Sequence, residues 1–173
     1  QLIDEEIKNA KAGKKAYIKL KMNNITNYKM IDKLYEASRA GVKIQMIVRG
    51  ICCLVPGIEG MSENIEVISI VDKFLEHPRL FIFANDGNPK VYISSADWMT
   101  RNISFRVEVG CPIYDENIKQ ELIDTFEISW ADNVKARIIN QAQNNIYKHN
   151  NKPLLRSQVA LYDYYLAKNK VTE

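Results

Sequence analysis

The sequence predicts an α/β fold in which a mixed sheet is flanked by helices and followed by a helical C-terminal tail. Residues 15–48 read as strand, helix and strand, a unit that normally joins two parallel strands through a crossover helix. A hairpin pattern over residues 80–93 adds an antiparallel pair. Residues 131–173 are polar and mixed, except for a final helical pattern over residues 159–168.

The elements of the first half are signalled by charge, periodicity and capping residues. Residues 2–12 have acidic side chains early and lysines later, which is typical of a short helix. Residues 15–22 alternate between apolar and polar side chains and so predict a strand. Asn27 then caps an expected helix that Gly41 ends, and residues 42–48 form the second strand.

The elements between and after these are shorter. We expect a strand over residues 65–71 and one turn of helix over residues 72–76, which leads to His77. Alternation over residues 105–109 predicts another strand, which ends before Pro112 interrupts the pattern.

A longer helix follows from Asp115, a good capping residue, to Trp130. Its large apolar side chains are spaced by four, and we assign them to the core rather than to a surface on which nucleic-acid bases stack. In the tail helix, an apolar side is expected at Leu161, Tyr162, Tyr165 and Leu166.

The hairpin brings candidate ligand-binding residues together. Its two apolar runs flank Asp86-Gly87, a strong local turn signal, so the two outer ends of the hairpin should lie close to each other. These ends carry basic, hydroxyl, carboxylate and amide groups, namely His77, Arg79, Ser94, Ser95, Asp97, Arg101 and Asn102. The set suits an anionic, oxygen-rich ligand such as a phosphate. The alternative is a hairpin with a satisfied histidine and solvated arginines.

Arg49 lies directly after the second predicted parallel strand. Ligands of parallel α/β sheets bind beyond the carboxyl ends of the strands, which is where a phosphate-binding arginine is expected. The first strand likewise ends in polar residues, at Lys21, Asn23 and Asn24. Pairing of Arg49 with Glu63 or Glu66 is the structural alternative.

Composition narrows the class of protein. A length of 173 residues suits one domain, and the start at Gln1 without a methionine suggests a piece of a longer chain. Residues 49–130 hold seven basic and thirteen acidic side chains, a net charge of −6, which argues against a broad nucleic-acid surface. Three cysteines and two histidines show no metal-ligand spacing, so we expect reduced thiols in a cytoplasmic protein and no metal site.

The phospholipase D signature, His-x-Lys-x4-Asp followed by a turn of small residues, offers a chemical comparison. His77-x-Arg79 fits in form and the turn resembles residues 94–97, but Ala84 stands where the acid is required. Without an acid to orient the imidazole, His77 suits donation of a proton or hydrogen bond to phosphate better than attack on phosphorus.

Blocks spread nearly from end to end resemble the C-terminal, phospholipase-D-like domain of the bacterial long-chain polyphosphate kinase family. They are K-M-N at 21–23, M-I-x-x-L-Y at 30–35, I-V-R-G-I-C at 47–52, P-G at 56–57, S-E-N-I at 62–65, F-L-E-H at 74–77, Y-I-S-S-A-D-W-M at 92–99, D-N-x-K-A-R at 132–137 and R-S-Q at 156–158. Residues 71–73, V-D-K, depart from the Gly-Arg of many members and place Asp72 near His77.

The resemblance implies an ATP–polyphosphate phosphotransferase that works through a phosphohistidine on a preceding domain, so the isolated chain is expected to be inactive. It implies that Arg49 contacts the nucleotide phosphates and that His77 is a second essential histidine that contacts phosphate. Arg79, Arg101 and Arg106 are further candidates for phosphate binding. The implied cofactors are ATP and Mg²⁺, with the magnesium-associated residues outside this chain.

The implied partners are ATP or ADP, inorganic polyphosphate and the preceding domains of the same polypeptide, with residues 1–173 as one domain. A homo-oligomer is expected for the full-length protein, in the cytoplasm or peripheral to the inner membrane. Two other functions are left open. One is a nucleotide- or polyanion-binding module without catalysis, and the other is a phosphodiesterase of the phospholipase D class, which Ala84 disfavours.

Overall fold

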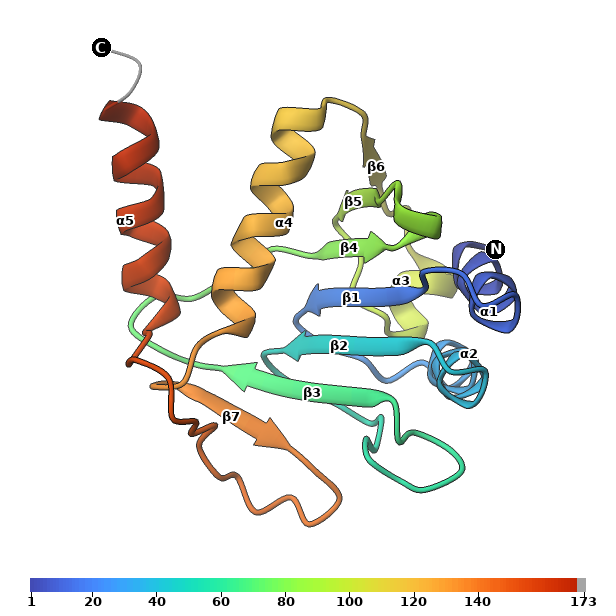
Figure 1. The fold of residues 1–173 in the computed structure, drawn as a ribbon. Helices are drawn as coiled ribbons and strands as arrows, with labels where there is room; N and C mark the ends of the chain where they lie inside the picture. The colour runs from blue at the N-terminus through green and yellow to red at the C-terminus, as the bar shows by residue number, and fades with distance from the viewer. Residues whose placement is uncertain (171–173) are drawn as a thin grey trace.

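A computed structural model describes residues 1–170 and shows a seven-stranded mixed sheet between two layers of helices (Figure 1). The strands are Tyr17–Met22 (β1), Lys43–Val48 (β2), Ile65–Ile70 (β3), Leu80–Phe83 (β4), Lys90–Ser94 (β5), Gly110–Ile113 (β6) and Ala136–Ile139 (β7). Their order is β6-β5-β4-β1-β2-β3-β7. The strands β1, β2 and β3 are parallel, whereas the pairs at both sides are antiparallel. The predicted mixed α/β sheet is confirmed.

The helices are Leu2–Lys11 (α1), Tyr28–Arg39 (α2), Thr100–Phe105 (α3), Glu116–Trp130 (α4) and Ser157–Lys170 (α5), with a short 3-10 turn at Asn85–Gly87 (η1). Both predicted caps are present. The side chain of Asn27 accepts a hydrogen bond from the backbone N–H of Met30, and Asp115 accepts one from Ile118. Gly41 follows α2 with φ +90, a conformation that costs glycine little.

Two apolar layers hold the sheet between the helices. On one face, alternate residues of β1 and β2 such as Leu20 and Met46 pack with α1 and α2. On the other face, Ile82 and Val91 pack around Phe126 of α4, which is 0% exposed. The helix α5 lies beside α4, where the Tyr164 hydroxyl donates to Asp124 over 3.0 Å (Figure 1). The predicted core role of α4 is therefore confirmed at its centre.

Some local predictions were wrong. Residues 72–76 form no helix, because their polar groups bind the tail instead of one another. The strand predicted at 105–109 is absent: Phe105 ends α3, and the backbone N–H of Val109 binds the Ser95 hydroxyl. Strand β6 begins only at Gly110, and it includes Pro112, which an edge strand tolerates because one of its sides needs no donor.

The tail also differs from the expectation. Strand β7 was not predicted, since its four residues lie in a polar stretch and are defined by pairing with β3. The expected apolar side of the last helix is largely open, with Tyr162 and Leu166 both exposed.

The three parallel strands β1, β2 and β3 all end at one edge of the sheet, here called the carboxyl edge. Strand β5 ends there too, whereas β4, β6 and β7 begin there, as the pairs Lys21 with Leu80, Ser94 with Gly110 and Ile70 with Ala136 show. Residues 71–79, here called the His77 loop, connect β3 to β4. Since β1 and β2 lie between those strands, this loop crosses their carboxyl ends.

Asp132 joins α4, β7 and α5 at this edge. Its fully buried carboxylate accepts hydrogen bonds from the backbone N–H groups of Val134, Lys135, Ala136 and Ser157. Burial alone would raise the pKa of Asp132, but these hydrogen bonds outweigh burial and hold that pKa below its ordinary value.

Asp132→Ala should lower the free energy of unfolding by about 3 kcal/mol, because it leaves several buried donors unsatisfied. Urea denaturation at neutral pH measures the loss, with the exposed Asp163→Ala of α5 as the control. Since the pKa of Asp132 is lower in the folded state than its ordinary value of 3.8, its contribution to stability is present above that pH. The difference between wild type and Asp132→Ala should therefore shrink only as the pH falls through the folded-state pKa. An equal difference at strongly acidic pH would contradict this role.

Candidate functional site

Asp97 is at the centre of the hydrogen bonds at the carboxyl edge. It is 5% exposed, and its Oδ1 accepts from the backbone N–H of Asn23 over 2.9 Å. The backbone and side chain of Asn24 also donate to its carboxylate, over 3.2 and 3.1 Å. Arg79 completes the shell with Nε 3.2 Å from Oδ1 and Nη2 3.1 Å from Oδ2. Burial opposes ionisation of Asp97, but Arg79 and the N–H donors outweigh it and lower the pKa.

Arg79 in turn orients His77. Its Nη1 lies 3.0 Å from Nδ1 of His77 and also donates to the His77 carbonyl over 3.2 Å. A guanidinium group only donates, so Nδ1 is the acceptor and the ring proton of the neutral imidazole sits on Nε2. The side chain of His77 is exposed. Its Nε2–H is therefore available to a ligand.

Arg49 follows the last residue of β2 and is held by the end of β1. Its Nε donates to Oδ1 of Asn23 over 3.0 Å, and its backbone N–H binds the Met22 carbonyl. Within residues 1–170, no ion pair joins Arg49 to Glu63 or Glu66, so the alternative interpretation is not what the structure shows. The two Nη groups of Arg49 remain available as donors.

Gly50 permits this arrangement. A Cβ at position 50 would lie 2.7 Å from Oδ1 of Asn24 and 3.0 Å from the Asn23 carbonyl. That oxygen of Asn24 also accepts from the backbone N–H of Ile51 over 2.9 Å. A side chain at position 50 would displace the two asparagines that hold Arg49 and Asp97.

The other predicted arginines are placed differently. Arg101 lies in α3 and Arg106 directly after it, both exposed, on the segment between β5 and β6. The nearby Glu108 is bound by Asn102 and Ser95 rather than paired with Arg106. The structure thus connects Arg49, Arg79 and His77 through hydrogen bonds, and it does not bring Arg101 or Arg106 into that network.

The sequence did not single out Asp97 or Asn23 as the residues that hold the site together. The hairpin register does indicate that Arg79 and Asp97 are near each other. Leu80 pairs with Ile93 and the Arg79 carbonyl accepts from Ser94, so Arg79 lies beside the residues that follow Ser94, which include Asp97. No such signal shows that Asp97 also turns back to bind the end of β1, because that contact depends on the strand order.

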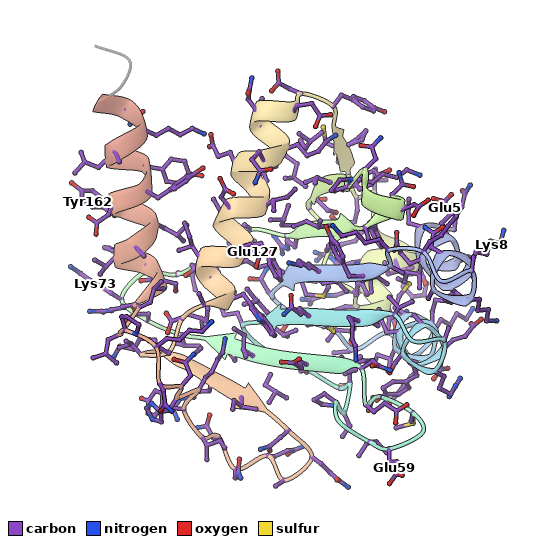
Figure 2. All side chains as sticks on the ribbon, in the orientation of Figure 1. Glu5, Lys8, Glu59, Lys73, Glu127 and Tyr162 are labelled. Carbon is purple, nitrogen blue, oxygen red and sulfur yellow. The ribbon has the colours of Figure 1, made fainter. Side chains whose placement is uncertain are left out.

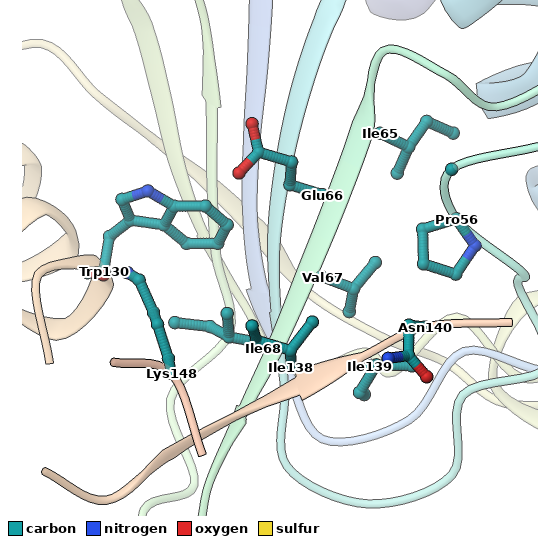
Figure 3. A pocket seen from close by; sticks show the side chains of 11 residues that line it. Pro56, Ile65, Glu66, Val67, Ile68, Trp130, Ile138, Ile139, Asn140 and Lys148 are labelled. Atoms are coloured by element: carbon teal, nitrogen blue, oxygen red, sulfur yellow. Dashed lines mark hydrogen bonds between the residues drawn. The ribbon is translucent and has the colours of Figure 1, made fainter. Parts of the chain in front are cut away.

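A separate cavity of about 240 Å³ is lined by residues of the paired strands β3 and β7 and of neighbouring segments (Figure 3). Trp130, Lys148 and Glu66 line one end, and Pro56 and Asn140 line the other. Burial lowers the pKa of Lys148 below its ordinary value. None of the predicted site residues lines this cavity, so it is distinct from the network at the carboxyl edge.

Metal clusters and membrane-spanning helices are both absent from residues 1–170. No group of three or more histidine, cysteine, aspartate or glutamate side chains in this part of the chain could hold a metal ion. No helix among the same residues is long and apolar enough to cross a membrane.

Comparison with known proteins identifies a family. Residues 1–158 match the family described as polyphosphate kinase C-terminal domain 2. The chain is 59% identical over 165 residues to polyphosphate kinase of Vibrio cholerae, which covers 95% of this chain and 24% of that protein. It is 48% identical to polyphosphate kinase of Escherichia coli K12, with the same coverage of 95% and 24%. The chain thus spans about a quarter of the length of these relatives.

Solved structures agree with the sequence comparison. The crystal structure of polyphosphate kinase from Porphyromonas gingivalis superimposes with a TM-score of 0.96 at 48% identity, over 98% of this chain and 26% of that one. Nuc from Salmonella typhimurium, a phospholipase D family member, gives 0.56 at 13% identity over 78% and 89% of the two chains, which shows the fold alone. The predicted phospholipase-D-like fold is confirmed. The chain belongs to the polyphosphate kinase family, in which it corresponds to C-terminal domain 2.

Proposed function

We propose that this chain supplies one half of the active site of an enzyme that transfers the terminal phosphate of ATP to inorganic polyphosphate. In this proposal, a preceding domain of the same polypeptide carries the nucleophilic histidine that becomes phosphorylated. The observation that supports it is the unbroken series of hydrogen bonds from Arg49 through Asn23, Asp97 and Arg79 to His77. It leaves two kinds of donor, a guanidinium and an imidazole N–H, at one edge of the sheet.

These donors fit the needs of phosphoryl transfer, which depends mainly on positioning and on neutralising charge that develops on phosphate oxygens. Arg49 offers two Nη groups for the nucleotide phosphates, and His77 offers Nε2–H as a hydrogen-bond donor to a phosphate oxygen. With Nδ1 accepting from Arg79, the neutral imidazole donates a hydrogen bond and does not act as a general acid. Arg79 is occupied by Asp97, so its main role in this proposal is to hold His77. Arg101 and Arg106 remain candidates for contact with a longer phosphate chain.

The fit of an oxygen-rich ligand has further support beside Arg49. Among the described residues, Nδ2 of Asn23 is buried and has no hydrogen-bond partner, which is a costly arrangement without an acceptor. A phosphate oxygen would satisfy it. The described residues include no group of three or more histidine, cysteine or acidic side chains that could hold a metal ion, and in this proposal most ligands of Mg²⁺ belong to other parts of the full-length protein.

Exposed apolar side chains support the idea of a half site. Phe105 is 81% exposed, Val107 is 100% exposed, and Ile103 and Val109 are also exposed, all on the segment that carries Arg106. Such a contiguous set is unusual on a surface that faces only water. We propose that residues 1–173 form one domain that other parts of the polypeptide complete, in a cytoplasmic homo-oligomer that also associates peripherally with the inner membrane.

Arg49 gives the direct test of nucleotide binding. In the full-length enzyme, Arg49→Ala should raise the KM for ATP about tenfold, because it removes charged donors to phosphate. Arg49→Lys should restore only part of the loss, since an ammonium group cannot form a bidentate fork. The matched control is Arg39→Ala, which removes an exposed arginine in the last turn of α2. An unchanged KM for ATP in Arg49→Ala would overturn the role given to this residue.

A further inference from the structure

The His77 loop carries the proposed catalytic histidine without any helix or strand of its own. Leu75 and His77 are exposed, whereas Asp72 and Glu76 have side chains that are only 3% and 18% exposed. The side chains of Asp72 and Glu76 and the backbone of Phe74 are bound by other parts of the protein, whereas the Phe74 side chain is 62% exposed. The groups that bind these three positions therefore also determine where the imidazole of His77 lies.

The side-chain amide of Gln158 in α5 binds both backbone groups of Phe74, in the middle of this loop. Its Oε1 accepts from the backbone N–H of Phe74 over 2.9 Å, and its Nε2 donates to the Phe74 carbonyl over 2.8 Å. The same Nε2 donates to Oε1 of Glu76 over 3.0 Å. The Gln158 side chain thus holds both the backbone of Phe74 and the carboxylate of Glu76, the residue directly before His77.

Arg156 and Lys21 bind the two ends of the anchored segment. Arg156 reaches Asp72 with both Nε and Nη2, over 2.7 and 2.6 Å, and this pair lowers the pKa of Asp72. Lys21 of β1 binds Glu76 over 2.5 Å. Asp72 is therefore engaged by Arg156 and is not a free negative charge beside His77.

The start of α5 is itself fixed to the body of the protein. The backbone N–H of Ser157 donates to Asp132 over 2.7 Å, and that of Leu155 donates to Asn133 over 2.7 Å. Figure 2 shows Lys73 beside the lower end of α5, where these contacts meet the loop. Hydrogen bonds therefore connect the residues after α4 to the start of α5, and the start of α5 to the His77 loop.

We propose that Arg156 and Gln158 are positioning residues for phosphoryl transfer, which act by holding the His77 loop across the carboxyl ends of β1 and β2. The proposal rests on the function given to His77 above. It explains two blocks of the tail, D-N at 132–133 and R-S-Q at 156–158, that lie outside the phosphate-binding network. Because both side chains are engaged by the His77 loop, their loss should affect turnover more than nucleotide binding.

The test uses the full-length enzyme with Gln158→Ala. We expect kcat to fall about tenfold, with the KM for ATP within about twofold of wild type. Amide hydrogen exchange in peptides over residues 72–77 should accelerate about tenfold, because the Phe74 backbone loses both partners. Gln120→Ala removes an exposed glutamine of α4 and serves as the matched control for both measurements.

A second pair of variants keeps the proposal testable if Gln158→Ala fails to fold, which exchange in residues 17–22 of β1 would reveal. Arg156→Ala should give the same two changes, and Arg156→Lys should restore part of each. Wild-type exchange over residues 72–77 in these variants would overturn the positioning role, as would faster exchange with unchanged kcat. If His77→Ala retained full activity, the proposed function would fail instead, and the exchange data would still report on the contact between tail and loop.

Discussion

In the full-length enzyme, His77→Ala should reduce the rate of ATP-dependent polyphosphate synthesis by about a hundredfold or more. The imidazole is held through Nδ1 by Arg79, so that its Nε2–H faces outward as a donor to phosphate. Alanine removes that donor from the point at which negative charge develops. The exposed side chain contributes little to the core, so the fold should remain stable.

The natural control is His149→Ala, since His149 is the second of the two histidines in the chain and is also exposed. This variant should keep the rate of wild type. Initial rates of polyphosphate formation, with thermal unfolding of each variant as a check on stability, give the comparison. A stable His77→Ala enzyme that synthesises polyphosphate as fast as wild type would rule out a catalytic role for this residue.

Local sequence signals were sufficient for the elements that depend on near neighbours. The alternation of β1, the cap at Asn27 and the turn at Asp86 each describe a few consecutive residues, and the structure has the expected element at each place. The strand and helix pattern also placed Arg49 at the carboxyl end of β2, where the structure has it, and there it lies near Glu76 and Pro78 of the His77 loop. These predictions needed no knowledge of how distant segments pair.

The predictions that were wrong concern segments whose structure depends on contacts with distant parts of the chain. Residues 72–76 have a composition that a short helix accepts, but their polar groups find stronger partners in Arg156 and Gln158, more than eighty positions along the chain. Strand β7 exists because Ala136 and its neighbours pair with β3, which no local pattern records. Tertiary contacts override weak local propensity in both cases.

The orientation of His77 also depends on contacts that local sequence does not reveal, because Ala84 stands where the phospholipase D signature has an acid. The sequence correctly indicated that no acid follows at the position of the phospholipase D signature, and Ala84 is indeed buried in the core. The structure instead orients His77 through Arg79, which Asp97 holds. A guanidinium at Nδ1 selects a ring proton on Nε2, which favours donation over nucleophilic attack.

Asp97→Asn should therefore lower turnover through His77, although Asp97 itself has no free oxygen to offer a ligand. All the groups that bind this carboxylate are donors: two backbone N–H groups, the amide of Asn24 and the guanidinium of Arg79. An asparagine would turn an NH₂ group toward one of these donors and would leave Arg79 without its buried counter-charge. Breaking such a pair costs about 3 to 5 kcal/mol of stability, so activity is compared at a temperature where each variant is fully folded.

The decisive measurement is a double-mutant cycle in the full-length enzyme. If Asp97 acts by way of Arg79 and His77, Asp97→Asn should lower kcat about tenfold or more alone and should have little further effect in a His77→Ala enzyme. Asp97→Glu, which keeps the charge on a longer side chain, should recover part of the single-variant loss. Equal reductions by Asp97→Asn in both backgrounds would show that Asp97 supports activity independently of His77. Arg79 would then be a structural partner of Asp97 and no longer the group that orients the imidazole.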